Sequence, residues 1–367
     1  MQSKFGMGRG DLYMKIHLNI RTRRFIAYLL GLAMVVCAIL FINHSVGTAS
    51  ALFHRDVVAI VPATSSNTHI FDERTDAWAD NFSGLFSAER LTSGGLRGPG
   101  LSAYAHISAV DNAYFNMVFM PFISGGPWHT DHTAIIMCRH LAWALFGAYE
   151  VAGQTVTIND VTFSVAGVVD NKIEPAEGAS NHGFAWISRE NMPGAGFVYL
   201  QPNVYNPLTA RLEAESLLNS LNERTRDFII TDVNMYINSI SLRAHILLLT
   251  LCIIIIIASA CWAVHLYHLS RSRVDIGVCV TLALGIAALA IVIFTSINIE
   301  IWLPDFMGDG LDAISMLVFN TGLLSSGQIL PSPLAALADI NTQANAAFVV
   351  GFGGFIVLGL TKFLSKD

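Results

Sequence analysis

Charged residues are scarce in this sequence of 367 residues: Asp, Glu, Lys and Arg make up 13%, while hydrophobic residues make up 53%. A typical soluble domain carries about a quarter charged residues. A chain with so few charges lacks the polar surface of a soluble protein, which indicates that lipid covers part of it. The hydrophobic residues are also concentrated in a few runs, whereas the middle of the chain has an ordinary globular composition.

Basic residues are unevenly spread. None lies between Val274 and Thr361, and residues 44–243 hold eleven Lys and Arg against nineteen Asp and Glu, a net charge of −8. The chain therefore lacks a basic face that neutralises phosphates, and we expect no binding to nucleic acid.

The five cysteines are too scattered for a disulfide framework. Cys37, Cys252, Cys261 and Cys279 fall in hydrophobic runs, and Cys138 is alone in the middle region. Since no pair is available there for a disulfide, the sequence is not that of a cysteine-stapled secreted module. We expect the cysteines to act as small apolar side chains in lipid or in a core.

Motifs of common enzyme classes are missing as well. The sequence has no G-x-S-x-G, no G-x-x-x-x-G-K-[ST] and no G-x-G-x-x-G after a strand. The cluster His129-Thr130-Asp131-His132 suggests a metal only if it is helical, and Pro127-Trp128 upstream indicates a loop. We therefore expect no catalytic residue, no cofactor and no metal site in this chain.

Four hydrophobic runs predict four transmembrane helices, because a bilayer core about 30 Å thick needs about 20 apolar residues in a helix. These predicted spans are residues 25–43, 244–269, 276–303 and 346–361. The first run has an alternative interpretation as a signal peptide, since the small residues 45–51 satisfy a cleavage site. Its length favours an uncleaved anchor.

Glycine is frequent in the last run, which contains Gly351, Gly353, Gly354 and Gly359. Small residues let membrane helices approach closely, but glycine is also tolerated in membrane helices without such contacts. Both interpretations are open at this point.

The positions of the basic residues predict the orientation of these spans. The tail 1–24, the turn 270–275 and the tail 362–367 carry all ten Lys and Arg outside residues 44–243. With four spans these segments share one side, which the positive-inside rule assigns to the cytoplasm. Residues 44–243 and 304–345 then lie outside. We expect a multi-pass protein of the bacterial inner membrane with both termini in the cytoplasm and a large periplasmic or extracellular domain.

Within the outer loop 304–345, residues 311–324 are apolar but too short and too interrupted to span the membrane comfortably. We expect this stretch at the membrane interface or packed on the outer domain.

Residues 44–243 predict a mixed α+β domain. The clearest element is a hairpin at residues 155–169, where two alternating runs flank Asn159-Asp160. Apolar residues at helical spacing predict an amphipathic helix over residues 208–226. Further strands are expected at residues 56–62, 104–110, 197–201 and 228–230, and glycine-rich loops at 93–100 and 175–183.

Residues 109–170 contain a series of short motifs in a fixed order. Tyr114-Phe115 is followed by Ser124-Gly125-Gly126, Leu145-Phe146-Gly147, residues 151–159 (VAGQTVTIN) and residues 163–170 (FSVAGVVD). The series resembles the periplasmic core domain of MacB/FtsX-type ABC transporter permeases. The order of one span, one large domain and three further spans is similar to the arrangement of that family.

The motif positions are structural by residue type, and none is a catalytic candidate. Glycines mark turns, and Phe146 is expected to anchor the core. The positions are Tyr114, Phe115, Gly125, Phe146, Gly147, Gly153 and Gly167.

The resemblance implies a permease subunit that hydrolyses no nucleotide itself. Such permeases form homodimers or heterodimers in the lipid membrane and move their outer domains in response to an ABC ATPase. It also implies a cytoplasmic coupling turn at Arg271, Arg273, Asp275 and Gly277, where Ile276-Gly277 matches a family signature.

The chain departs from the family in this turn, because it becomes apolar at once where the family continues with a coupling helix. The alternative hypothesis is therefore a membrane-anchored binding or scaffold protein that is not coupled to an ATPase.

Overall fold

The computed structural model describes residues 9–54, 56–62, 79, 82–128, 132–170, 183–192, 196–204, 206–220, 224–269, 285–286 and 332–363. The chain divides into two compact units, which are described separately. The first comprises Met1–His44, Ser241–Trp302 and Gln343–Asp367, and the second comprises Ser45–Ile240 and Leu303–Thr342.

Three long helices carry the hydrophobic runs: α1 (Arg9–Ser50), α6 (Val233–Leu269) and α9 (Ser332–Phe363). Each contains a stretch that is long and apolar enough to cross a membrane, namely Phe25–Ser50, Val233–Cys261 and Pro333–Leu360. Three of the four predicted spans thus correspond to apolar helices. The predicted span 276–303, apart from residues 285–286, lies outside the described residues, as do the turn 270–275 and the stretch 311–324.

These helices begin earlier than the hydrophobic runs indicate. Helix α6 starts at Val233 because Asp232 caps it: Oδ1 of Asp232 accepts a hydrogen bond from the backbone N–H of Met235 at 3.0 Å. Polar residues in its first turns, such as Asn234, obscure this start in the sequence. Helix α9 starts beside Pro333, and proline is favoured in the first turn of a helix.

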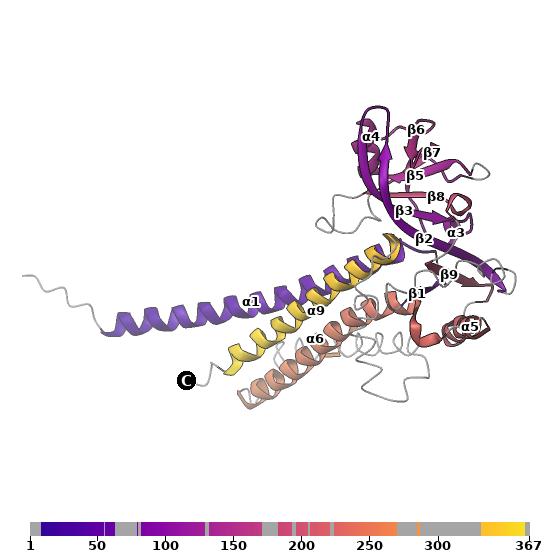
Figure 1. Cartoon of the computed structure of the whole chain (residues 1–367). Coiled ribbons are helices and arrows are strands. Elements are labelled where there is room, and N and C mark those ends of the chain that lie inside the picture. The colour runs from indigo at the N-terminus through magenta and orange to yellow at the C-terminus, as the bar shows by residue number, and fades with distance from the viewer. Residues whose placement is uncertain are drawn as a thin grey trace, which may run out of the picture. The chain divides into compact units, whose positions relative to one another are not determined.

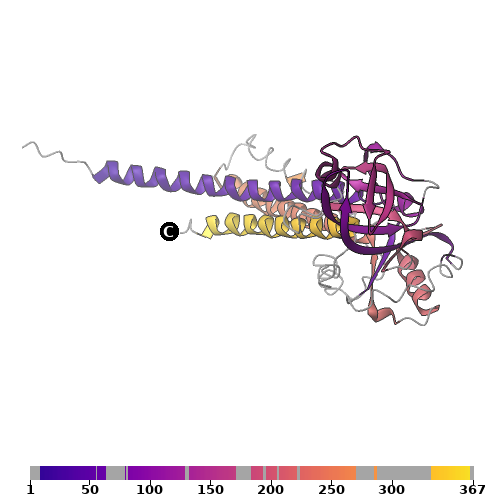
Figure 2. The ribbon, with the colours of Figure 1, turned by 45° about the horizontal axis from the view of Figure 1, so that its top comes forward.

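Helix α9 runs alongside α1 in both views of the ribbon (Figures 1 and 2). A Cβ added to Gly354 would lie 2.7 Å from the carbonyl oxygen of Gly31, and one added to Gly351 would lie 3.0 Å from Cβ of Ala38. Of the two interpretations of these glycines, close helix packing therefore applies at Gly351 and Gly354. It does not hold at Gly359, around which a Cβ meets nothing within 4 Å.

The second unit contains a sheet of ten described strands (Figure 1). Hydrogen-bonded neighbours follow the order β10-β1-β9-β2-β3-β8-β5-β7-β4, and β6 pairs with both β2 and β7. The pairs β3·β8 and β5·β7 are parallel, and the other pairs are antiparallel. The strands are β1 (Val58–Pro62), β2 (Gly84–Arg97), β3 (Ser102–Val110), β4 (Phe122–Gly125), β5 (Ala134–Cys138), β6 (Thr155–Ile158), β7 (Val161–Val169), β8 (Gly183–Ser188), β9 (Phe197–Pro202) and β10 (Phe228–Asp232).

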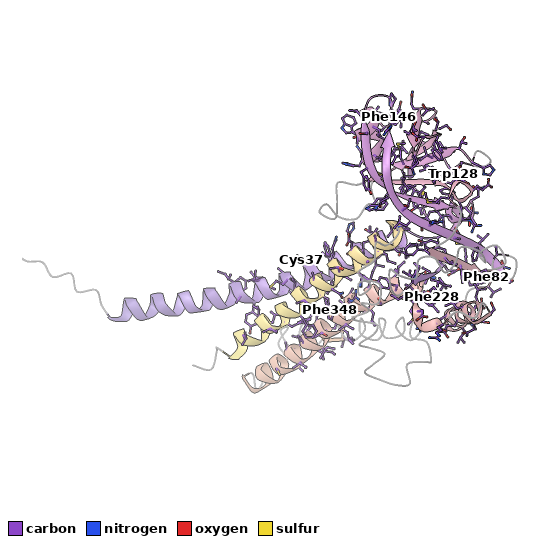
Figure 3. All side chains as sticks on the ribbon, viewed as in Figure 1. Cys37, Phe82, Trp128, Phe146, Phe228 and Phe348 are labelled. Carbon is purple, nitrogen blue, oxygen red and sulfur yellow. The ribbon has the colours of Figure 1, made fainter. Side chains whose placement is uncertain are left out.

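Short helices cover parts of this sheet. They are α3 (Tyr114–Met117), α4 (Arg139–Phe146), α5 (Pro207–Ser220) and the 3₁₀ turns η3 (Arg189–Asn191) and η4 (Thr225–Asp227). Helix α5 buries Ala210, Ala214 and Leu218 against β1, β9 and Phe228 of β10, and Phe82 packs against the same cluster (Figure 3). The predicted amphipathic helix is therefore confirmed, although it ends at Ser220.

The predicted hairpin is confirmed: β6 and β7 pair from Thr155↔Ser164 to Ile158↔Val161. Asn159 and Asp160 both have positive φ, at 47° and 67°, as a tight turn with primed geometry requires. The predicted loop at residues 93–100 is wrong for residues 93–97, which belong to β2, and is confirmed for residues 98–100. In β2, Gly94 and Gly95 pair with β3 through their backbones, and Gly95 lies opposite Tyr104.

Candidate functional site

The chain runs from α1 into strand β1 and from strand β10 into α6, and these two strands pair with each other. Strand β1 follows α1 after seven residues, and β10 ends at Asp232, immediately before α6. The two strands are antiparallel, with Val58 opposite Asp232. Both helix connections therefore lie at the same end of the β1–β10 ribbon. We call this region, residues 51–54, 56–58 and 232–236, the root of the sheet domain.

Two hydrogen bonds join the two sides of the root. The N–H of Val233 donates to the carbonyl oxygen of Val57 at 3.0 Å, and Nδ2 of Asn234 donates to Oδ1 of Asp56 at 2.8 Å. Asp56 has a positive φ of 75°, which is uncommon for a residue other than glycine. The start of α6 is thus bonded to the chain that has just left α1.

A second set of backbone hydrogen bonds holds the root to the segment that follows α3. Phe53 forms an isolated antiparallel bridge with Val118, which follows α3. The N–H of His54 donates to the carbonyl oxygen of Met117 at 2.8 Å, and the N–H of Phe119 donates to that of Leu52 at 3.0 Å. Residues 52–54 therefore act as a short strand against the segment behind α3.

Aromatic rings continue this contact into the core. The ring of Phe53 lies 6.4 Å from that of Tyr199, which in turn meets Tyr114 edge-to-face at 5.6 Å. Phe115 meets Tyr114 at 5.9 Å and Trp128 at 4.8 Å, both edge-to-face. Such pairs favour a fixed relative orientation of the rings.

A carboxyl group lies fully buried at the end of this aromatic row. Oε2 of Glu89, on β2, accepts a hydrogen bond from the Tyr199 hydroxyl at 2.7 Å, and no part of the residue is exposed. Burial raises the pKa of Glu89 to about 7, although interactions with the Ser108 and Tyr199 hydroxyls lower it in part. Near neutral pH this carboxyl therefore exists in both protonation states.

A second carboxyl organises the start of α3. Oδ2 of Asp111 accepts from the N–H of Ala88 at 3.1 Å, and Oδ1 accepts from the N–H of Tyr114 at 3.2 Å. Burial raises the pKa of Asp111, while Ser87, these N–H groups and the charge of Arg189 lower it in part. The pKa values of Tyr114 and Tyr199 are raised well above the ordinary value by burial and by Glu89, so both phenols stay neutral.

The motif positions predicted from the sequence are not one site. Tyr114 and Phe115 lie in the aromatic row just described, whereas the others lie in α4, in turns and in strands elsewhere in the domain. Gly147 ends α4 in the left-handed conformation and donates to Trp143, and Gly153 also has a positive φ, so both are at turns. The residues of the predicted coupling turn, Arg271, Arg273, Asp275 and Gly277, lie outside the described residues.

Two motif residues differ from the expectation. Gly167 is not at a turn but inside β7, where it pairs with Gly125, and a Cβ there would lie 2.8 Å from the carbonyl oxygen of Gly126. Phe146 is half-buried, at the end of α4 (Figure 3), because Leu141 and Leu145 occupy the helix face that meets the sheet.

Glu89 is not among the residues that the sequence predicts to be functional. In the sequence it stands between Ala88 and Arg90, with nothing that indicates a buried position. Its partner Tyr199 is 110 residues away, so no local pattern connects the two.

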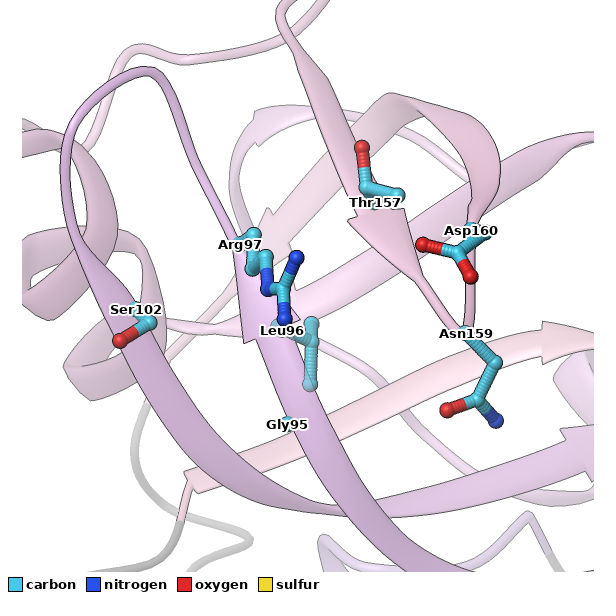
Figure 4. Close-up of a pocket in the computed structure, with 7 residues that line it drawn as sticks. All are labelled: Gly95, Leu96, Arg97, Ser102, Thr157, Asn159 and Asp160. Atoms are coloured by element: carbon cyan, nitrogen blue, oxygen red, sulfur yellow. The ribbon is translucent and has the colours of Figure 1, made fainter.

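A polar pocket of about 440 Å³ lies between the tips of two hairpins (Figure 4). It carries one charge of each sign, from Arg97 on β2 and Asp160 in the β6–β7 turn, and Gly95, Leu96, Ser102, Thr157 and Asn159 complete its lining.

Among the described residues, no three His, Cys, Asp or Glu side chains come together as metal ligands. Of the cluster 129–132 only His132 is described, and its Nδ1 pairs with Oε2 of Glu190 at 3.0 Å.

Residues 26–228 match the family model of the MacB-like periplasmic core domain. The solved structures similar to this chain include the periplasmic region of MacB from Actinobacillus actinomycetemcomitans, with a TM-score of 0.40 and 15% identity over 49% of this chain and 89% of that one. Another is the extracellular domain of the noncanonic ABC-type transporter YknZ from Gram-positive bacteria, with a TM-score of 0.38 and 11% identity over 48% of this chain and 100% of that one. No curated protein sequence matches this chain.

Proposed function

Since the chain belongs to the family of proteins with a MacB-like periplasmic core domain, we propose that it is the permease subunit of an ABC-type transporter or mechanotransmission complex. Its outer domain moves in response to a partner ATPase, and the chain itself performs no catalysis. The observation that supports this role most directly is the root, where two membrane helices are bonded to one strand ribbon.

The root is suited to passing helix motion into the sheet. Strand β1 pairs with both β10 and β9, and β9 pairs with β2, so a displacement at Val58 reaches the centre of the sheet through backbone hydrogen bonds. Backbone ladders resist sliding because several bonds must break together. Rigid-body motion of the sheet is therefore the expected response.

The proposal includes a topology, a partner and a dimer. Both termini lie in the cytoplasm, and the turn at residues 270–275 meets the ATPase through Arg271, Arg273 and Asp275. A second permease chain, identical or different, completes the complex in the membrane. The coupling turn holds two of the basic residues that the positive-inside rule assigns to the cytoplasm.

Reporter fusions test this topology. A fusion after Asp367 is expected to be active in the cytoplasm, and fusions after Asn203 or Gly310 are expected to be active only when exported. A cytoplasmic signal at Gly310 would contradict the four-span arrangement, because three spans alone leave that loop on the other side.

Co-purification tests the coupling. The tagged chain is expected to retain an ABC ATPase whose hydrolysis is sensitive to vanadate. The triple variant R271A/R273A/D275A is expected to lose about 90% of the bound ATPase, since hydrogen bonds between charged groups are about twice as strong as neutral ones. The variant K362A/K366A is the matched control, because it removes two charges from the same proposed side of the membrane.

If no ATPase is retained by the unaltered chain, and the triple variant keeps the phenotype of the unaltered gene, the permease proposal is wrong. A membrane-anchored scaffold, which keeps the outer domain without ATPase coupling, is then the better description.

A further inference from the structure

A continuous row of contacts leads from the end of α1 to the buried carboxyl of Glu89. Residues 52–54 are hydrogen-bonded to the segment behind α3, Phe53 packs on Tyr199, and Tyr199 donates its hydroxyl hydrogen to Glu89. All of these residues belong to the second unit. The protonation state of the Glu89 carboxyl therefore affects how strongly residues 52–54 of the root are held on the sheet.

Among the residues that the structure describes, few ionisable groups surround this carboxyl. The side chains that face it are the neutral phenols of Tyr199 on β9 and Tyr114 on α3, and the hydroxyl of Ser108 on β3. Asp111, next to α3, is a second buried carboxyl, and the nearby cation, Arg189, acts on Asp111. Within the described part of the chain, the charge of Glu89 is therefore stabilised by the hydroxyls of Ser108 and Tyr199.

Burial favours the protonated form of Glu89 in the structure as described, which we call the closed form, although the hydroxyls of Ser108 and Tyr199 stabilise the charged form in part. Among the described residues, Oε1 of Glu89 and Oγ of Ser108 make no hydrogen bond of ordinary geometry, although the two side chains interact. Since no part of Glu89 is exposed, water does not compensate a charge on this carboxyl while the surrounding side chains stay packed. An ionised carboxylate would have to be hydrated, which requires the surrounding side chains to separate.

We propose that Glu89 is a proton-controlled latch, which holds residues 52–54 on the sheet while its carboxyl is protonated and releases them when the carboxyl ionises. The latch concerns the outer domain itself and does not depend on the identity of the ATPase or of the transported substrate. A rise in external pH would thereby loosen the attachment of α1 to the sheet.

The direction of the effect follows from the two protonation equilibria. In the closed form the pKa of Glu89 is about 7, above its ordinary value of 4.5. The closed form therefore binds the proton more tightly than the open form, in which residues 52–54 have left the sheet. The free-energy advantage that protonation gives the closed form is complete below about pH 4.5 and is lost as the pH rises towards 7. The opening equilibrium constant is expected to increase about tenfold per pH unit in this window and to level off above it.

Hydrogen exchange of the full-length protein in detergent tests the latch. The amides of His54 and Phe119 make the bonds that the latch protects, and their protection factors, which remove the intrinsic pH dependence of exchange, are to be measured between about pH 5 and pH 8.5. In the unaltered chain we expect protection to fall by about 100-fold up to pH 7 and then to stay level. In E89Q it should be independent of pH, since glutamine mimics the neutral acid. The exposed Glu150 provides the control E150Q, which should behave as the unaltered chain does.

Tyr199→Phe separates a latch from a merely structural contact. The variant keeps the ring but removes a hydrogen bond that lowers the pKa of Glu89. The pH at which protection levels off should therefore move upwards by about one unit. Protection that does not change with pH in the unaltered chain, or changes equally in E89Q, overturns the proposal, as does a Tyr199→Phe profile that levels off at the original pH.

Discussion

Replacing Gly125 by alanine is expected to destabilise the outer domain by about 3 kcal/mol or more. An added Cβ would lie 2.0 Å from the carbonyl oxygen of Ala166 and 2.9 Å from Cα of Gly167, and both are backbone atoms that cannot rotate away. Gly125 also has a φ of 68°. Overpacking costs about 1–3 kcal/mol, and the left-handed conformation costs an L-residue about 1–2 kcal/mol more.

Thermal unfolding of the full chain in detergent measures this effect. A loss of about 3 kcal/mol lowers the Tm of a domain of this size by about 6–12 °C. The neighbouring variant Gly126→Ala is the matched control, because a Cβ there meets nothing within 4 Å, and its Tm should change by less than about 2 °C. Equal melting temperatures for the two variants would show that β4 and β7 do not approach as closely as described.

Replacing Gly354 by leucine is expected to separate α9 from α1. Its Cβ alone would lie 2.7 Å from the carbonyl oxygen of Gly31 and 2.9 Å from Cγ2 of Val35, and the rest of the side chain has no space between the helices. Membrane helices associate largely through close packing of this kind, since lipid supplies no hydrophobic drive between them. We expect a loss of about 2–3 kcal/mol and a large fall in the yield of monodisperse protein in detergent.

The same helix supplies the control for this variant. Gly359 is exposed and an added Cβ there meets nothing within 4 Å, so Gly359→Leu adds the same side chain where no neighbour is displaced. Monodispersity by size-exclusion chromatography and the melting temperature should be close to those of the unaltered chain. If Gly359→Leu is as harmful as Gly354→Leu, helix propensity or insertion explains the loss, and packing against α1 does not.

The elements that the sequence predicts best are those with a local pattern. Hydropathy alone locates α1, α6 and α9, because lipid requires a long apolar run. The hairpin around Asn159-Asp160 is predicted because two alternating runs and a turn of suitable residues adjoin each other. Each of these signals is complete within about 20 residues.

The elements that the sequence does not predict depend on distant partners. Strand β2 looks like a loop because of Gly94 and Gly95, and only its pairing with β3 makes it a strand. The bond between Asp56 and Asn234 joins residues 178 positions apart, and that between Glu89 and Tyr199 spans 110. The root and its buried carboxyl therefore become visible only once the sheet order is known.

The way in which the two helices attach to the β1–β10 ribbon makes the joint respond to the direction of a pull. Both connections lie at the Val58–Asp232 end, so a force that parts them opens the ribbon like a zipper, one residue pair after another. The bonds of Asp56 with Asn234 and of Val57 with Val233 stand ahead of the first pair and must break before it. A force along the strands instead meets all five pairs at once. The paired strands are accordingly weak against a force that separates them from this end and strong against a force along the strands.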